Sequence, residues 1–225
     1  MNELNDTEPD ALDWSIWESR FARFLADNVA ADAAHDLAHV RRVVANARRL
    51  ADAEGAERAV VLPAVWLHDC VVVPKDSPQR TQASRLAADA ATAFLRSAGY
   101  PARYLDDIAH AIAAHSFSAR IPPETLEARV VQDADRLDAL GAVGIARTLM
   151  LGGALNRPFY DPDDPFAAAR QPDDGLWTLD HFFTKLLTLA DTMQTSTGRA
   201  EARHRTAFMQ GYLEQLRAEI PGDEE

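Results

Sequence analysis

Five residues whose side chains can hold a metal ion are dispersed along this chain, in segments that predict separate helices. They are His35 and His39, the doublet His68-Asp69, and Asp135. More than twenty residues separate the three groups, so only a folded helical bundle can bring them to one point. A divalent cation binds imidazole and carboxylate ligands that converge in this way, with a position left for water or substrate. The pattern therefore constrains the fold and indicates a metal-dependent hydrolase.

The composition favours a single helical domain. The chain has 225 residues, 47% of them are hydrophobic, and alanine is abundant whereas valine and isoleucine do not dominate. This mixture favours helices, and a chain of this length can bury a substantial core.

Apolar residues recur at spacings of three and four along most of the chain, as they do in amphipathic helices. They predict helices over about residues 14–25, 33–54, 57–73, 81–97, 101–115, 125–140, 142–150, 179–193 and 198–219. The polar segment 74–80 predicts a loop. Residues 152–176 contain several prolines, aspartates and glycines and predict a long loop, of the kind that forms a functional lid or is poorly ordered. No strand pattern is convincing, so we expect an all-α fold.

Charge and cysteine content argue against several classes of protein. The formal net charge is −12 and the isoelectric point is about 5.0, whereas binding to duplex nucleic acid or an anionic membrane needs clustered lysine and arginine. Cys70 is the single cysteine, so no intramolecular disulfide exists, and we expect it to serve packing. The N-terminus lacks a signal-peptide pattern, and no apolar run reaches the roughly 18 residues that span a bilayer. We expect a soluble cytoplasmic protein.

The groups of candidate ligands differ in how strongly they indicate a metal site. His35 and His39 are four residues apart on one helix face, where both can bind a metal or one can line the pocket. The doublet His68-Asp69 follows the apolar run VLPAVWL, and a buried carboxylate there needs a partner. An ion pair or cap at a helix end would supply one, whereas a divalent ion would satisfy both side chains together.

Three aspartates punctuate the apolar stretch VVQDADRLDALGAVG. A solvated acidic face fits Asp133 and Asp138, whereas Asp135 is placed to look inward. We therefore expect Asp135 to join His39 and the doublet in one ligand set, and Asp138 to lie outside it.

Four segments resemble the HD superfamily of metal-dependent phosphohydrolases, in particular its small bacterial single-domain branch. They are HDLAHVRRV, VWLHDCVVVPKDSPQR, AIAAHSFSA and VVQDADRLDALGAVGIAR, and DHFFTKLL followed by MQT is similar to that branch as well. The resemblance implies one HD domain over residues 1–225, an all-α HD-domain helical bundle. Its core would cover about residues 30–150 and a C-terminal helical extension about residues 178–219.

The resemblance also implies a ligand set and a reaction. Its four metal ligands would be His39, His68, Asp69 and Asp135, and family members hydrolyse phosphoester or phosphoanhydride bonds, typically in nucleotides. Asp69 is expected to accept a proton from water besides binding the metal. We expect manganese as the cation; iron, cobalt, nickel and zinc also suit two imidazoles and two carboxylates, and magnesium suits them less well.

Further residues near the expected site are candidates for holding phosphate. Lys75 and Arg80 suit this role, with Lys75 also stabilising charge during catalysis; a solvated loop is the alternative. His35 is expected to line the substrate pocket. His115 lies on the buried face of its helix, as a core histidine, a second-metal ligand or a phosphate contact, and His110 is expected to be structural.

Three functions stay open at this point. The first is hydrolysis of a nucleoside phosphate, with pyrophosphate released from a triphosphate as the expected reaction. The second is a phosphodiesterase or phosphomonoesterase for another small substrate, in which the loop 159–177 shapes the pocket. The third is a metal-binding regulatory module without turnover.

The chain lacks the motifs GxxxxGKS/T and HExxH and a glycine-rich dinucleotide turn. A homodimer through the aromatic stripe near Trp14 is also open.

Overall fold

Helices form every regular element in the described part of the chain, residues 12–28, 37–73, 77, 80–116 and 119–220 of the computed structural model. In chain order they are α1 (Trp14–Asn28), α2 (Leu37–Glu54), α3 (Arg58–Leu67), η1 (Arg80–Gln82), α4 (Ala83–Ser97), η2 (Ala102–Tyr104), α5 (Leu105–His115), α6 (Leu126–Leu137), α7 (Gly141–Ala154), α8 (Asp180–Thr184), η3 (Leu186–Thr192) and α9 (Ser196–Glu219), where η marks a 3₁₀ helix. No strand occurs among these residues, so the prediction of an all-α fold is confirmed.

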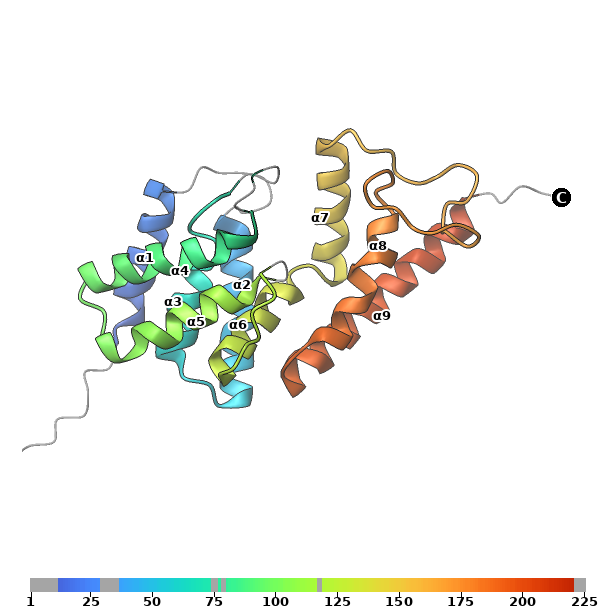
Figure 1. The fold of residues 1–225 in the computed structure, drawn as a ribbon. Helices are drawn as coiled ribbons and strands as arrows, with labels where there is room; N and C mark the ends of the chain where they lie inside the picture. The colour runs from blue at the N-terminus through green and yellow to red at the C-terminus, as the bar shows by residue number, and fades with distance from the viewer. Residues whose placement is uncertain (1–11, 29–36, 74–76, 78–79, 117–118, 221–225) are drawn as a thin grey trace, which may run out of the picture.

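The helices form two groups that lie side by side (Figure 1). In the first group, α1 to α6 make a bundle in which α5 packs against α4 and α6, while α2 and α3 pack against each other and against α6. The second group, α7 to α9, stands on one side of this bundle. Because α9 packs against α2 and α6 as well as α7, the C-terminal extension is docked on the bundle.

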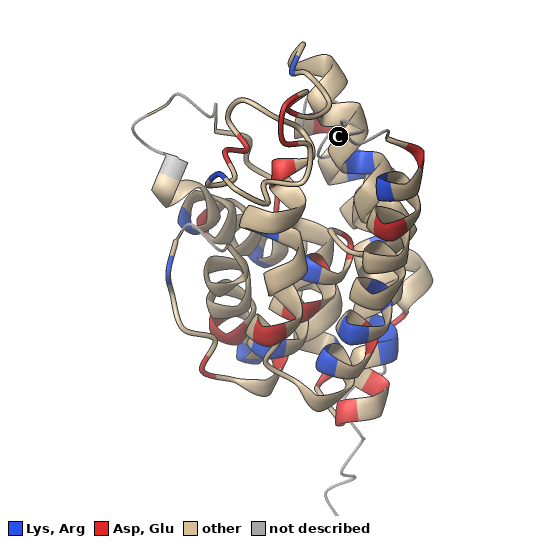
Figure 2. Ribbon diagram, turned by 90° about the vertical axis from the view of Figure 1, so that its right-hand side faces the viewer, with Lys and Arg blue, Asp and Glu red and all other residues tan. Residues whose placement is uncertain are grey.

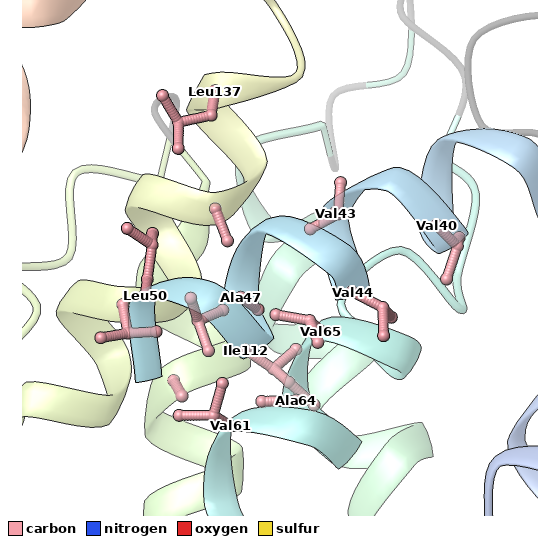
Figure 3. Close-up of a cluster of buried hydrophobic side chains, with 14 of the residues drawn as sticks. Val40, Val43, Val44, Ala47, Leu50, Val61, Ala64, Val65, Ile112 and Leu137 are labelled. Atoms are coloured by element: carbon pink, nitrogen blue, oxygen red, sulfur yellow. The ribbon is translucent and has the colours of Figure 1, made fainter. Parts of the chain in front are cut away.

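The apolar stripe of α2 meets α3 in the core of the bundle (Figure 3). Every residue of α3 from Ala59 to Leu67 is buried, and a helix that is apolar all round can be stable only when other helices enclose it. Figure 3 shows Ile112 of α5 among the same side chains. The inward-facing residues that the sequence predicts for α2 are all buried, namely Val40, Val43, Val44, Ala47 and Leu50.

The aromatic stripe of α1 packs inside the same chain. Phe21 is fully buried, and its ring centroid lies 6.4 Å from that of Trp66 in α3. Phe24 stacks on Phe94 of α4 at a centroid distance of 4.2 Å. These contacts fix α1 to the bundle, as expected for core packing.

Several helix boundaries differ from the prediction. α3 ends at Leu67 rather than near Val73, because Cys70 N donates to Leu67 O at 3.1 Å and closes a tight turn. The doublet His68-Asp69 therefore lies in this turn and not inside a helix. The helix predicted over 179–193 is divided into α8 and η3, and α7 extends to Ala154.

The long loop after α7 is held by hydrogen bonds to a buried carboxylate. Asp180 is fully buried and accepts from Arg170 Nη2 at 2.9 Å and from Asp173 N at 2.6 Å. Arg170 Nε also lies 3.1 Å from Asp161 Oδ2. The loop is thus folded on itself and joined to the first turn of α8 by these contacts.

A second buried carboxylate joins α6 to the start of α9. Asp133 is fully buried and accepts from Gln194 N at 2.9 Å, Thr195 N at 2.8 Å and Thr195 Oγ1 at 2.8 Å. Burial raises the pKa of Asp133, and these hydrogen bonds oppose that shift only in part. The expectation that Asp133 belongs to a solvated acidic face is wrong, because the first turn of α9 covers it.

Charged residues are interspersed on the side of the molecule shown in Figure 2. Acidic and basic positions are mixed along its helices and loops. Within α9, for example, Arg205 Nε pairs with Glu201 Oε1 at 2.7 Å. The excess of negative charge is therefore not gathered into one acidic region on this face.

No single helix among the described residues is long and apolar enough to cross a membrane. α6 and α7 together pass that test by length and composition only, and the pair is bent by 63° at the break between them. In α6 the apolar residues Val130, Val131 and Leu137 are buried in the bundle.

Two glycines of α9 test the junction with Asp133. At Gly198 a Cβ atom would lie 2.4 Å from Asp133 Oδ2 and 2.7 Å from Thr195 Oγ1, whereas at Gly211 it would meet nothing within 4 Å. We expect Gly198→Ala to lower the free energy of unfolding by about 1–3 kcal/mol through overpacking. Gly211→Ala should raise it by about 0.5–1 kcal/mol because alanine is the better helix former. Urea denaturation of both variants measures this; equal stabilities would contradict the tight junction.

Candidate metal centre

Four segments bring their metal-binding side chains to one end of the bundle. His39 comes from the first turn of α2, and His68 and Asp69 from the turn after α3. His115 is the last residue of α5, and Asp135 lies in the last turn of α6. Helix ends and turns thus present every member of the group, which leaves the apolar middle of each helix for the core.

The imidazole Nε2 atoms and the carboxylate oxygens of these residues converge. Nε2 of His39 and Nε2 of His68 lie 3.6 Å and 3.7 Å from the same atom, Asp135 Oδ1. Asp69 lies between two rings, with Oδ2 at 3.5 Å from His68 Nε2 and Oδ1 at 3.5 Å from His115 Nε2. Two overlapping groups could therefore hold a metal ion, and they share one histidine: His39, His68 and Asp135 form the first, and His68, Asp69 and His115 the second.

The other nitrogen of each ring is held by an acceptor. His68 Nδ1 donates to Val65 O at 2.8 Å, and His115 Nδ1 donates to Ile112 O at 2.6 Å. His39 Nδ1 lies 2.7 Å from Asp138 Oδ2. A carbonyl oxygen only accepts, so Nδ1 of His68 and of His115 carries a proton, and in a neutral His68 ring the lone pair of Nε2 then faces the centre. This arrangement is typical of metal-binding histidines.

The burial of His68 fits a divalent cation. Its Nε2 atom is buried and has no hydrogen-bond partner among the described residues, and burial lowers the pKa of the ring, which keeps it neutral. A buried nitrogen lone pair without a partner is costly unless an ion or a donor satisfies it. The side chains of Asp69 and Asp135 are 29% exposed. Together these residues offer imidazole nitrogens and carboxylate oxygens beside open space.

The ring of His115 lies beside the negative charges of Asp69 and Asp135. Burial alone lowers the pKa of its ring, but the hydrogen bond and the charge of Asp69, with the charge of Asp135, outweigh burial and raise it. The two carboxylates therefore favour a positive charge at this point. His115 is buried, as the helix pattern predicts, and it lies against a ligand candidate rather than in the apolar core.

The prediction that the Asp138 side chain is solvated is wrong. This residue is 2% exposed and accepts from Arg42 Nε at 2.7 Å, in addition to its contacts with Nδ1 of His39 and the guanidinium of Arg147. Burial would raise the pKa of Asp138, but these donors and charges lower it to about 2. Asp138 thus stays ionised and holds the His39 ring from behind.

A cavity of about 380 Å³ opens over the converging side chains. Its lining comes from both helix groups: His39, Asp69, Val71, Val72, Ala83, Ser84, His115, Ser116, Asp135, Arg136, Ala139, Arg147, Lys185 and Leu189. Sequence reasoning missed Arg147 and Lys185. The sequence did contain a signal for Arg147, because it is the one charged residue in the apolar sequence of α7. Lys185 lies in the segment DHFFTKLL, for which only the family resemblance was noted.

Three predicted substrate-binding residues are not placed. His35 and Lys75 lie outside the described residues, and of Arg80 only the backbone, at the start of η1, is described. Their roles stay predictions. His110 Nε2 accepts from Glu124 N at 2.9 Å, a structural contact as expected. Cys70 is buried, and burial together with the charge of Asp69 raises the pKa of its thiol to about 12, so it forms no thiolate nucleophile.

The segment that contains the candidate metal ligands matches a known family of proteins. A family model described as HD domain matches residues 36–140. A protein of Bacillus subtilis (strain 168) described as uncharacterized protein YpgQ is 37% identical over 192 residues, which are 84% of this chain and 85% of that protein.

Solved structures with the same fold include two close in length to this chain. The crystal structure of Bacillus subtilis YpgQ in complex with ADP has a TM-score of 0.70 and 33% identity, over 91% of this chain and 100% of that chain. An HD-superfamily hydrolase from Bacillus thuringiensis has a TM-score of 0.67 and 32% identity, over 90% and 97%. The helical bundle, the matched segment and these relatives agree: the chain belongs to the HD superfamily.

Proposed function

We propose that this protein is a metal-dependent phosphohydrolase that acts on a nucleoside phosphate and releases pyrophosphate from a nucleoside triphosphate. The observation that carries the proposal is the convergence of two histidine–carboxylate groups beneath a cavity that also contains arginine and lysine side chains. Cation ligands and phosphate-binding side chains in one cavity suit phosphoryl transfer, which depends mainly on positioning and electrostatics.

His39, His68, Asp69 and Asp135 would hold the cation, with manganese as our first expectation. Two imidazoles and two carboxylates also suit iron, cobalt, nickel and zinc, and magnesium less well. When bound, the cation supplies Lewis acidity, which lowers the pKa of water and polarises a phosphoryl oxygen. The Nε2 atom of His68, which has no hydrogen-bond partner among the described residues, supports a cation at this point.

Asp69 is our candidate for the general base. Its carboxylate is partly exposed at the cavity, and it lies 3.5 Å from the Nε2 atoms of His68 and His115. A carboxylate there can accept a proton from the attacking water at its oxygen, while the two imidazoles keep it in place. His115 beside it would stabilise negative charge on the substrate.

Arginine and lysine residues would bind the phosphate groups. We keep Lys75, Arg80 and His35 in this role as proposals, and add Arg147 of the described cavity. Guanidinium groups form paired, charge-assisted hydrogen bonds with phosphate oxygens. A nucleotide substrate draws support from a relative, because Bacillus subtilis YpgQ has been solved in complex with ADP.

The proposed reaction predicts a product pattern. With manganese, the full-length protein should convert a nucleoside triphosphate to the monophosphate and pyrophosphate, measured by chromatography of the nucleotides and an assay for pyrophosphate. A panel of nucleoside mono-, di- and triphosphates, cyclic nucleotides and aryl phosphates separates the alternatives. Release of phosphate from monophosphates, or turnover confined to cyclic nucleotides or aryl esters, would indicate the other hydrolases. Absence of turnover with every cation would indicate a metal-binding regulatory module instead of an enzyme.

Asp69 tests the proposed ligand set. Asp69→Ala should lose both bound metal and hydrolysis while the far-ultraviolet circular dichroism stays helical, because the apolar core does not depend on this side chain. Elemental analysis gives the metal per chain, and turnover is measured on the same samples. Asp89→Ala, at an exposed position of α4, is the matched control. An Asp69 variant that retains metal and activity would remove the basis of the proposal.

Variants of Asp138 test whether its contact with Nδ1 of His39 supports metal binding. Asp138→Ala removes the acceptor of His39 Nδ1, and such changes weaken metal binding by about 10–100-fold. The variant should still load at saturating manganese, since Asp138 is not itself an expected ligand. Asp138→Asn keeps an oxygen that can accept from His39 and should recover part of the affinity. Metal titrations of both variants check this; unchanged affinity in Asp138→Ala would show that the contact does not matter.

A further inference from the structure

One wall of the cavity comes from outside the segment that matches the HD model. That segment ends at residue 140, whereas Arg147 lines the cavity from α7, and Lys185 and Leu189 line it from the C-terminal extension. The candidate metal ligands all lie within the matched segment. The cavity is therefore complete only when the second group of helices stands beside the bundle.

The three described cations of the cavity differ in what they already contact. Arg136 Nη1 donates to Thr192 O at 2.6 Å, and Arg147 forms an ion pair with the buried carboxylate of Asp138. Lys185 is exposed, and its ammonium makes no hydrogen bond or ion pair with any residue that the structure describes. No described residue pairs with this ammonium group, which lines the cavity.

Lysine is unusually rare in this protein. The chain contains 2 lysines and 21 arginines, so arginine serves as its general surface cation. The two residues are not equivalent, because the lysine ammonium is a compact point charge with three donors on a flexible stem. Lys185 is the one lysine in the described part of the chain, and it lies at the cavity. The cavity therefore contains an ammonium group beside the guanidinium groups of Arg136 and Arg147.

The backbone around Lys185 is fixed on both sides. Phe182 before it and Leu186 after it are buried. His181 Nδ1 lies 2.6 Å from Asp174 Oδ2, and Thr184 Oγ1 donates to the same oxygen at 3.2 Å. A long side chain on a rigid backbone can place its charge reproducibly while its tip adapts to the ligand.

We propose that Lys185 binds the pyrophosphate part of the substrate and makes the enzyme prefer triphosphates, an inference that rests on the proposed function. His39 and His115 beneath the cavity are 3% and 6% exposed, whereas Lys185 is exposed and lines the same cavity. A phosphate chain that starts at the buried histidines and runs toward solvent therefore reaches the ammonium with its outer phosphates.

Kinetics with two leaving groups test this assignment. Lys185→Met should lower kcat/KM for a nucleoside triphosphate by about ten- to a hundredfold, the loss of one charge-assisted hydrogen bond. On a nucleoside 5′-(p-nitrophenyl) phosphate, which has no outer phosphates, the loss should be at least about tenfold smaller. Arg203→Met, at an exposed position of α9, removes the same charge away from the cavity and serves as control. Equal losses on both substrates, or none on the triphosphate, would overturn the inference.

A second measurement does not depend on turnover. Reductive methylation of the manganese-loaded protein, followed by mass spectrometry, should modify Lys185 readily and less so in the presence of inorganic pyrophosphate, with the terminal amino group as reference. Identical methylation with and without pyrophosphate would overturn the inference. Protection of Lys185 in a protein that turns over no nucleotide would instead retain the binding site and contradict the proposed function, so the two failures can be told apart.

Discussion

The whole arrangement depends on compensating one buried carboxylate, Asp138. Removing a carboxylate from water is costly unless donors and cations surround it. Here the partners are Arg42 from α2, Arg147 from α7 and Nδ1 of His39. One side chain therefore joins the bundle to the second group of helices and also turns an imidazole ring toward the candidate metal centre. Structural and chemical roles coincide at this residue.

Helix α6 and the residue at its C-terminal cap, Asp138, distribute three carboxylates among three tasks. Each residue of an α-helix turns by about 100° from the one before, so the aspartates at 133, 135 and 138 point in different directions. Asp133 holds the start of α9, Asp135 faces two imidazole nitrogens, and Asp138 holds α2 and α7. The same helix thus positions the site and the segment that covers it.

The cavity divides its chemistry between two parts of the chain. Residues of the HD match supply the converging imidazoles and carboxylates, and the later helices supply Arg147, Lys185 and Leu189. In our proposal the first part activates water and the second binds the leaving phosphates. Substrate preference can then change through Lys185 and Leu189 without replacing a metal ligand, whereas Arg147 contacts both Asp138 and Nδ1 of His39 and so connects the two parts.

The sequence by itself predicted most of the helices and the inward faces of α1 and α2, because apolar spacing is a local property. The set His39, His68, Asp69 and Asp135 came from the order of ligand types and the resemblance to the HD superfamily, and as a ligand set it stays a prediction; the structure brings these residues together in two overlapping groups that also include His115. Only the tertiary structure decided that Asp133 and Asp138 are buried and that Arg147 and Lys185 line the cavity. The physical reason is that the exposure of a charge depends on distant partners: Arg42 lies 96 residues from Asp138 along the chain, and Thr195 lies 62 residues from Asp133.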